Sequence, residues 1–210
     1  MTDYEALKTA VMRGKRNDVT AIVRQALEAG EDVNLLLDRG MIPAMREIGD
    51  RFSRNEAYVP ELLIAARAMQ AGMALIEPLI ADSGRQPLGL VAIGTVKGDL
   101  HDIGKNLVAI MLKGAGYEVL DLGVNCDIPQ YEEAIRQGAS ILGLSSLLTT
   151  TMPYMREVVE HFKGRGVKII IGGAPTSQAY ADEIGADGYS EDANDAVKLV
   201  ASLLAGEQNA

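Results

Sequence analysis

The chain has 210 residues, of which 48% are hydrophobic, and a formal net charge of −9. This length allows one large domain or two small ones, and an acidic chain without clustered Lys and Arg is not expected to bind nucleic acid. One cysteine excludes an internal disulfide framework and suits a reducing cytoplasm. No stretch comes near the roughly 20 apolar residues of a membrane helix, and no secretory signal is evident, so we expect no membrane association.

Residues 1–84 are predicted to form a helical cap domain, a four-helix bundle. Apolar residues recur at helical spacing in four segments. The apolar faces of these four predicted helices contain Leu7, Val23, Met45 and Met69, respectively. Asn17 or Asp18 is expected to cap the second helix, and Gly40 to break the chain after a short helical turn. A polar stretch at Asp82–Pro87, which contains Gly and Pro, is predicted to be a linker.

Residues 88–210 alternate between strand and helix patterns. The predicted strands are Leu88–Ile93, Glu118–Leu122, Ile141–Ser145, Val167–Ile171 and a weak fifth near Asp187–Tyr189. The predicted helices are Ile103–Ala115, Pro129–Gln137, Pro153–Arg165, Ser177–Ile184 and Ala193–Leu204. Continuous Val, Ile and Leu runs indicate strands buried on both faces, and hence a parallel sheet. We therefore predict an α/β fold, a flavodoxin-like (Rossmann-like) doubly wound five-stranded sheet in the order 2-1-3-4-5.

Such sheets bind ligands where the strand order reverses, beyond the carboxyl ends of the strands. The loop after strand one carries Asp99 and His101, one residue apart. The loop after strand three, Ser145–Thr151, is rich in hydroxyl groups, and the loop after strand four begins with Gly172 and Gly173. Three loops of unusual composition are therefore predicted to meet at one edge of the sheet.

The common phosphate and metal patterns do not fit these loops. The spacing from Gly98 to Lys105 is one residue too long for a P-loop, and Asn106 stands where Ser or Thr should bind magnesium. No Gly-x-Gly-x-x-Gly follows strand one, and Ser145 stands where a receiver domain needs its aspartate. Two histidines and one cysteine cannot form a multi-histidine or zinc cluster. The gap suits a bulky, neutral, amide-rich ligand tail.

The run Gly94-Thr-Val-Lys-Gly-Asp-Leu-His-Asp-Ile-Gly-Lys-Asn106 resembles the Asp-x-His-x-x-Gly motif of cobalamin-binding methyl-carrier (corrinoid) proteins. It is similar to the cobalamin-binding module of cobalamin-dependent methionine synthase, and the resemblance covers nearly the whole chain. The resemblance implies cobalamin as cofactor, cycling between methyl-Co(III) and Co(I). It also implies His101 as the lower axial cobalt ligand, with Asp99 as the partner that fixes the imidazole tautomer.

The same resemblance assigns roles to other residues. Ser145 and Thr149 are expected to contact the buried base of the cofactor, and Thr151 to bond the aspartate where the family often has Ser. The glycine pair Gly172-Gly173 is expected to lie against the nucleotide tail. The further contacts implied in this way are Gly98, Asp102, Ile103, Gly104 and Leu147. Asp102 and Lys105 have a second interpretation that is as strong as a ligand contact. Asp102 would then be a charge at the N-terminus of a helix, and Lys105 an exposed lysine.

The segment that leads into the fourth helix resembles the cap motif of the family. Tyr58, Leu62 and Met69 are therefore candidate contacts of the corrin ring, although relatives often have phenylalanine where this chain has Tyr58. The helical domain is expected to protect the upper face of the cofactor and to swing away about the linker. Outside the site, His161 is expected on a solvated helix face and Cys126 to be an inert small residue.

The resemblance implies a non-catalytic carrier subunit. It would take a methyl group from a substrate-specific methyltransferase to a second methyltransferase with a folate or thiol acceptor, and a reductive activating protein is the expected third partner. The donor is left open among methanol, methylamines, glycine betaine and aryl methyl ethers. One alternative is a cobalamin-binding sensor or regulatory module, which should carry an output domain that residues 1–210 leave no room for. Another is the cobalamin subunit of a mutase, which usually lacks the helical lid.

Overall fold

The structure, a computed structural model, describes residues 2–80 and 87–207. The chain divides into two compact units, Met1–Pro87 with Gly114–Gly116 and Leu88–Lys113 with Tyr117–Ala210. Apart from Pro87, the predicted linker lies outside the described residues. Its role as a hinge, like the boundary between residues 84 and 88, stays a prediction.

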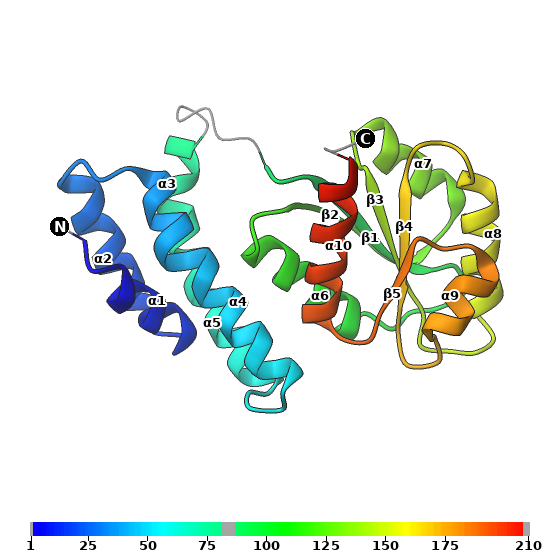
Figure 1. Ribbon diagram of the computed structural model, residues 1–210, viewed down its shortest axis with the longest axis horizontal. Helices are drawn as coiled ribbons and strands as arrows, with labels where there is room; N and C mark the ends of the chain where they lie inside the picture. The colour runs from blue at the N-terminus through cyan, green and yellow to red at the C-terminus, as the bar shows by residue number, and fades with distance from the viewer. Residues whose placement is uncertain (1, 81–86, 208–210) are drawn as a thin grey trace. The chain divides into compact units, whose positions relative to one another are not determined.

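The first unit is helical, as predicted (Figure 1). Its helices are α1 (Tyr4–Met12), α2 (Arg16–Glu28), α3 (Val33–Leu36), α4 (Ile42–Ser53) and α5 (Val59–Ile80). A π-helical turn, η1 (Leu37–Met41), joins α3 to α4. The expected cap of α2 is wrong, because the helix already begins at Arg16 and neither Asn17 nor Asp18 precedes it.

Gly40 does not break the chain, contrary to prediction. It lies within η1, and the backbone stays helical on both sides. A Cβ atom at this position would lie 2.6 Å from Cδ2 of Leu7 in α1. A larger residue at position 40 would force the buried Leu7 side chain to move, so close packing against α1 favours glycine, a reason that its sequence neighbours do not reveal.

Helix α5 is the core helix of this unit. Among the described residues it alone is long and apolar enough, by length and composition, to cross a membrane, so the expectation that no stretch comes near that length is wrong. It packs against α1, α2 and α4. Its buried residues are Leu62, Ala65, Ala66, Ala68, Met69, Gly72 and Ile76. Burial against the other helices accounts for one apolar face of α5, while Val59, Ile64 and Leu79 are exposed.

The second unit is the predicted five-stranded parallel sheet. Its strands are β1 (Leu90–Val96), β2 (Glu118–Cys126), β3 (Ile141–Ser145), β4 (Lys168–Gly172) and β5 (Gly188–Ser190), in the order β2-β1-β3-β4-β5. All four neighbouring pairs are parallel. The predicted strand order is confirmed. Two predicted strands differ in their bounds: β2 continues to Cys126 instead of ending at Leu122, and β1 spans Leu90–Val96 instead of Leu88–Ile93, so it runs closer to Asp99 than predicted.

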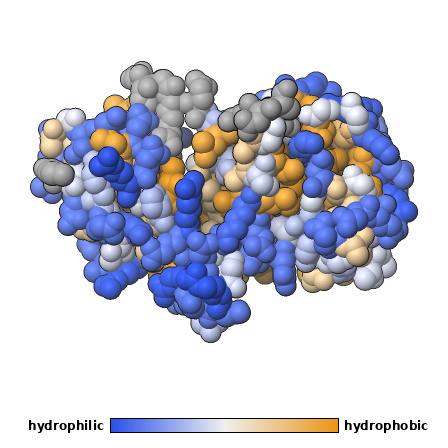
Figure 2. All heavy atoms as spheres, in the orientation of Figure 1, coloured by the Kyte–Doolittle hydropathy of each residue, from blue (hydrophilic) through white to orange (hydrophobic). Residues whose placement is uncertain are grey.

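Five helices cover the two faces of this sheet (Figure 1). They are α6 (Ile103–Gly114), α7 (Ile128–Arg136), α8 (Met152–Phe162), α9 (Gln178–Ile184) and α10 (Ala193–Glu207). Helices α7, α8 and α9 bury Tyr131, Met155 and Phe162 against one face. On the opposite face α10 lies close enough for Leu199 to meet a Cβ placed on Gly188 of β5. In the view of Figure 2, hydrophobic residues gather around α10 and hydrophilic ones cover most of the surface.

Contrary to the prediction, His161 does not lie on a solvated helix face. It is half-buried in α8, with Nε2 2.8 Å from a carboxylate oxygen of Glu132 in α7. Its ring also meets the edge of Phe162, with centroids 4.7 Å apart. This histidine therefore ties two helices together on the sheet face.

Candidate functional site

Asp99 is the buried centre of the loop that joins β1 to α6. Its side chain is fully inaccessible and both oxygens accept hydrogen bonds. Oδ1 accepts from the backbone N–H of His101 at 3.0 Å and lies 2.7 Å from Nδ1 of the same residue. Oδ2 accepts from the backbone N–H of Leu147 at 2.8 Å and from the Thr151 hydroxyl at 3.0 Å. The loop after β3 thus meets the loop after β1, as the switch-point argument requires.

The hydrogen bonds to Asp99 keep it ionised. Burial alone would raise the pKa of this carboxyl, but the bonds from Leu147, His101 and Thr151 outweigh burial and hold its pKa well below the ordinary value. An ionised carboxylate only accepts hydrogen bonds, so the imidazole proton lies on Nδ1 of His101. Nε2 then carries the lone pair, an arrangement in which a carboxylate partner fixes the tautomer and leaves the second ring nitrogen able to bind a metal.

The Thr151 hydroxyl is itself held by the loop after β3. Ser146 is buried, and its Oγ lies 2.7 Å from Thr151 Oγ1. If Thr151 donates to Asp99, the Ser146 hydroxyl can donate to Thr151, so each hydroxyl proton has an acceptor. This chain of two hydroxyls ending on a carboxylate fixes the orientation of all three side chains.

Exposed apolar side chains stand next to His101 in the chain and on the loop whose backbone holds Asp99. His101 is 51% exposed, and its neighbours Leu100 and Ile103 are 71% and 80% exposed. Leu147 and Leu148, whose N–H groups both point at Asp99, are also largely exposed. Leucine and isoleucine exposed together beside a half-exposed ligand nitrogen are typical of a site that receives an apolar partner surface.

Two of the predicted site glycines differ in why they are needed. At Gly173, with φ of 120°, a Cβ would lie 1.9 Å from the carbonyl oxygen of Ser146, so the packing of the two loops requires glycine there. At Gly104, in the first turn of α6, a Cβ would meet nothing within 4 Å and the backbone is helical. Nothing within the second unit explains a helix-weakening glycine at position 104. The open space there fits a bulky ligand that lies against the backbone.

The other predicted residues of the second unit also lie near this edge. Ser145 ends β3, where it pairs with Thr95 of β1 and Gly172 of β4, and Thr149 is exposed on the loop that follows. Gly98 has φ of 86°, a left-handed turn conformation that favours glycine. The structure brings these residues to one edge of the sheet, while their contacts with a cofactor stay a prediction.

The structure places Asp102 and Lys105 in different environments. Asp102 is exposed just before α6 and accepts a hydrogen bond from the Asn106 side chain, as a helix N-terminal residue does. Lys105 is buried, not exposed, and its Nζ pairs with Asp121 of β2. Of the two alternatives for Lys105, the exposed lysine is wrong, because the side chain fills the space between α6 and the edge strand.

The three predicted ring contacts of the helical unit differ in exposure. Tyr58, just before α5, is 64% exposed, whereas Leu62 and Met69 within α5 are buried. Tyr58 also donates its backbone N–H to the Glu61 side chain. Of the three, Tyr58 has the side chain that is free to meet a ligand.

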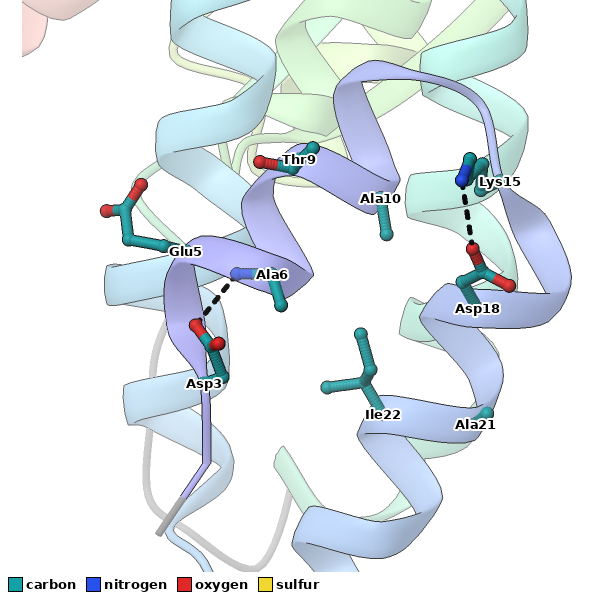
Figure 3. A pocket seen from close by; sticks show the side chains of 9 residues that line it. All are labelled: Asp3, Glu5, Ala6, Thr9, Ala10, Lys15, Asp18, Ala21 and Ile22. Atoms are coloured by element: carbon teal, nitrogen blue, oxygen red, sulfur yellow. Dashed lines mark hydrogen bonds and ion pairs between the residues drawn. The ribbon is translucent and has the colours of Figure 1, made fainter.

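A hollow between α1 and α2 is a separate feature of the helical unit (Figure 3). Ala6, Ala10 and Ile22 point into it, and the charged groups at its rim are engaged locally. Asp3 caps α1 through the N–H of Ala6, and Lys15 pairs with Asp18. Its carboxyl groups do not form a metal-binding cluster, since no group of three or more His, Cys, Asp or Glu side chains among the described residues could hold a metal ion.

Sequence reasoning missed three residues that support the loop after β1. Thr95 donates its hydroxyl to the carbonyl of His101 at 2.7 Å. Asn125, at the end of β2, accepts a hydrogen bond from the N–H of Gly98 at 2.8 Å. Ser146 acts through Thr151, as described above. Only the polar character of Thr95 within an apolar strand could have drawn attention to it.

Comparisons with known proteins agree with this geometry. A family described as a B12 binding domain matches residues 89–198, and a second of the same description matches residues 4–77. A dimethylamine corrinoid protein of Methanosarcina acetivorans is 41% identical over 96% of this chain and 97% of its own. The chain belongs to the family of cobalamin-binding corrinoid proteins.

Further similar proteins also match nearly the whole of this chain. A corrinoid protein of Desulfitobacterium hafniense is 37% identical over 97% of this chain and 98% of its own. The methanol:cobalamin methyltransferase complex of Methanosarcina barkeri contains a chain that is 29% identical, with a TM-score of 0.83 over 96% of this chain and 79% of that one. A cobalamin-binding protein of Desulfitobacterium hafniense, also 29% identical, has a TM-score of 0.78 over 95% and 98%.

The residues of this chain fit the cofactor of the family, which is cobalamin. An imidazole with an available Nε2 suits a cobalt ion, the apolar side chains of Leu100, Ile103 and Leu147 suit the flat macrocycle, and the open space at Gly104 leaves room for it. Among the described residues no group of three or more His, Cys, Asp or Glu side chains could hold a metal ion by itself.

Proposed function

We propose that this protein carries a methyl group on the cobalt of bound cobalamin from a substrate-specific methyltransferase to a second methyltransferase, with His101 as the lower axial ligand. The single observation that carries the proposal is the bond between His101 Nδ1 and the buried Asp99 carboxylate, which leaves Nε2 available for cobalt. Cobalamin, when bound, supplies a cobalt atom that accepts a methyl group and gives it up again.

The residues of the chain have three tasks in this proposal. His101 is proposed to bind the metal through Nε2, while Asp99 holds the proton on Nδ1 and so fixes the tautomer of the imidazole. The loop after β3 fixes Asp99 through Leu147 and Thr151. Tyr58 and the helical unit are proposed to cover the upper face of the cofactor and to exclude water from it.

The partners follow from the same proposal. The dimethylamine corrinoid relatives make dimethylamine the first donor to test, before methanol, glycine betaine and aryl methyl ethers. The acceptor is proposed to be a folate or a thiol on the second methyltransferase, and a reductive activating protein is proposed to restore oxidised cobalt. The chain itself is proposed to be a carrier subunit of the cytoplasm, not the catalyst.

The test is the visible spectrum of the protein loaded with hydroxocobalamin. The wild type should give the spectrum of histidine-ligated cobalamin, and His101→Ala should give that of a water- or base-ligated form. His161→Ala is the matched control, because it removes the only other imidazole of the chain. An unchanged spectrum in His101→Ala would exclude His101 as ligand. The carrier role is tested by methyl transfer from dimethylamine, methanol, glycine betaine and aryl methyl ethers, each with its methyltransferase. Failure of the loaded wild type with all of these donors would contradict the carrier role.

A further inference from the structure

Asn125 occupies an unusual backbone conformation beside the site. Its φ is 54°, and among the described residues only Asn55 is another non-glycine residue with positive φ. Asparagine tolerates this left-handed conformation better than most residues, but glycine has no steric cost there. The backbone alone therefore does not explain why position 125 is an asparagine.

The irregular register of β2 brings Asn125 to the loop that carries Asp99. Ile93 and Gly94 are adjacent in β1 but pair with Asp121 and Gly123, which are separated by one residue. A second shift follows, since Gly94 and Val96 pair with Gly123 and Cys126. Such bulges insert extra residues and redirect side chains, often next to functional sites. The second bulge contains Asn125.

Asn125 then makes two hydrogen bonds to consecutive residues of the loop. Its side-chain Oδ1 accepts from the N–H of Gly98 at 2.8 Å. Its own backbone N–H donates to the carbonyl oxygen of Asp99 at 3.0 Å. The N–H of Asp99 is held in turn by the carbonyl of Val96 at 3.1 Å. The backbone on both sides of the Asp99 side chain is thus fixed from β2 and β1.

We propose that Asn125 is a positioning residue: it holds the N–H of Gly98 and the carbonyl oxygen of Asp99, the peptide groups on either side of this pair, so that the Asp99 carboxylate meets the His101 imidazole and keeps Nε2 available to cobalt. The left-handed bulge places the side chain, and Oδ1 supplies the acceptor that glycine lacks. The consequence for cobalt rests on the proposed function, whereas the effect on the loop does not.

The experiment begins with the cofactor-free protein and two variants of position 125. Asn125→Gly keeps the backbone conformation and removes only the acceptor, while Asn125→Asp keeps an acceptor oxygen and tolerates positive φ. Asn55→Gly is the matched control, the same change at the other left-handed asparagine. By NMR, the Gly98 amide of Asn125→Gly should exchange with solvent about fivefold faster, as expected for the loss of one net hydrogen bond. Its His101 Nδ1 proton signal should weaken or shift.

Asn125→Asp should retain the wild-type exchange and imidazole signals, as should Asn55→Gly. After loading with hydroxocobalamin, the equilibrium constant for histidine ligation should fall about fivefold in Asn125→Gly. Unchanged Gly98 exchange and an unchanged His101 signal in cofactor-free Asn125→Gly would overturn the positioning role. If those signals change as expected but wild-type cobalamin is not ligated by histidine, the proposed function fails and the positioning role in the loop stands.

Discussion

Lys105 of α6 and Asp121 of β2 form an ion pair whose two side chains differ sharply in exposure, 2% for the lysine and 41% for the aspartate. Nζ of Lys105 also donates to Asn106 at 2.7 Å, and the N–H of Gly123 donates to Asp121 at 2.9 Å. Burial opposes ionisation of Asp121, but the hydrogen bonds from Lys105 and Gly123 and the nearby lysine charges together outweigh burial and lower the pKa of this carboxyl. The pair ties the helix that follows His101 to the edge strand.

This asymmetry predicts unequal costs for removing either partner. Lys105→Met leaves a carboxylate that water can reach, so we expect a loss of about 1 kcal/mol in the free energy of unfolding. Asp121→Ala leaves a buried ammonium with only an amide oxygen as acceptor, and we expect a loss of about 2–3 kcal/mol. Asp121→Asn, which keeps the oxygen, should fall between the two. Urea unfolding measures all three, and equal losses for Lys105→Met and Asp121→Ala would contradict the argument.

Asp99 should be a stability residue even without cofactor. Asp99→Ala removes the acceptor for Leu147, Thr151 and His101 in a buried position, and unsatisfied buried donors are costly, so we expect a loss of about 3 kcal/mol. Thr151→Val removes one of these bonds and should cost about 1 kcal/mol, whereas Thr151→Ser keeps the hydroxyl and should cost less. Chemical unfolding of the cofactor-free protein tests this order. Full stability in Asp99→Ala would mean that the loop does not depend on the carboxylate.

The sequence was sufficient to predict the sheet and the meeting of its loops, because each rests on local patterns. The apolar runs marked the strands, and the carboxyl ends of parallel strands necessarily share an edge, so Asp99, His101 and Thr151 could be expected together. The supporting residues could not be predicted in this way. Asn125 reaches Gly98 only because two bulges extend β2 beyond Gly123, which looks like a strand breaker in the sequence.

The same limit applies to residues whose role depends on a distant neighbour. Gly40 looks like a helix end, but its neighbour Leu7 lies far back in the chain. Lys105 looks like a solvated residue near a helix start, but Asp121 on another element holds it in a buried site. Close packing and pairing between elements are not encoded in hydrophobic periodicity, which reports only which face of an element is apolar.

Cys126 should be unreactive in the folded protein. The residue is fully buried, and burial raises the pKa of its thiol from 9.0 to about 11. At pH 8 the thiolate fraction is then roughly 100-fold lower than that of a free cysteine, before any effect of restricted access. Alkylation by iodoacetamide should be slow in the native state and fast in urea. Rapid native labelling would contradict the burial.

The raised pKa of Cys126 also predicts a pH dependence of stability. Between about pH 9 and 11 the unfolded state loses the thiol proton while the folded state keeps it, so stability should fall as pH rises. Below pH 9 both states are protonated and the contribution is fully present. Cys126→Ala should lack this part of the slope in unfolding experiments across that range. An identical slope in wild type and variant would assign the effect to other groups.

Gly104 offers a test that separates stability from cofactor binding. Its backbone is helical and a Cβ would meet nothing within 4 Å, so Gly104→Ala should stabilise the cofactor-free protein by about 0.5–1 kcal/mol, because alanine favours helix. If the cofactor lies against this turn, the added methyl group should weaken cobalamin binding by about tenfold or more.

Gly206 of α10 is the matched control for Gly104, since it too is helical with nothing within 4 Å of a Cβ. Gly206→Ala should not lower stability and should leave cobalamin binding unchanged. Thermal unfolding of the cofactor-free variants and equilibrium titration with hydroxocobalamin measure the two effects separately. If Gly104→Ala is more stable than the wild type and still binds cobalamin equally well, the cofactor does not lie against this turn of α6.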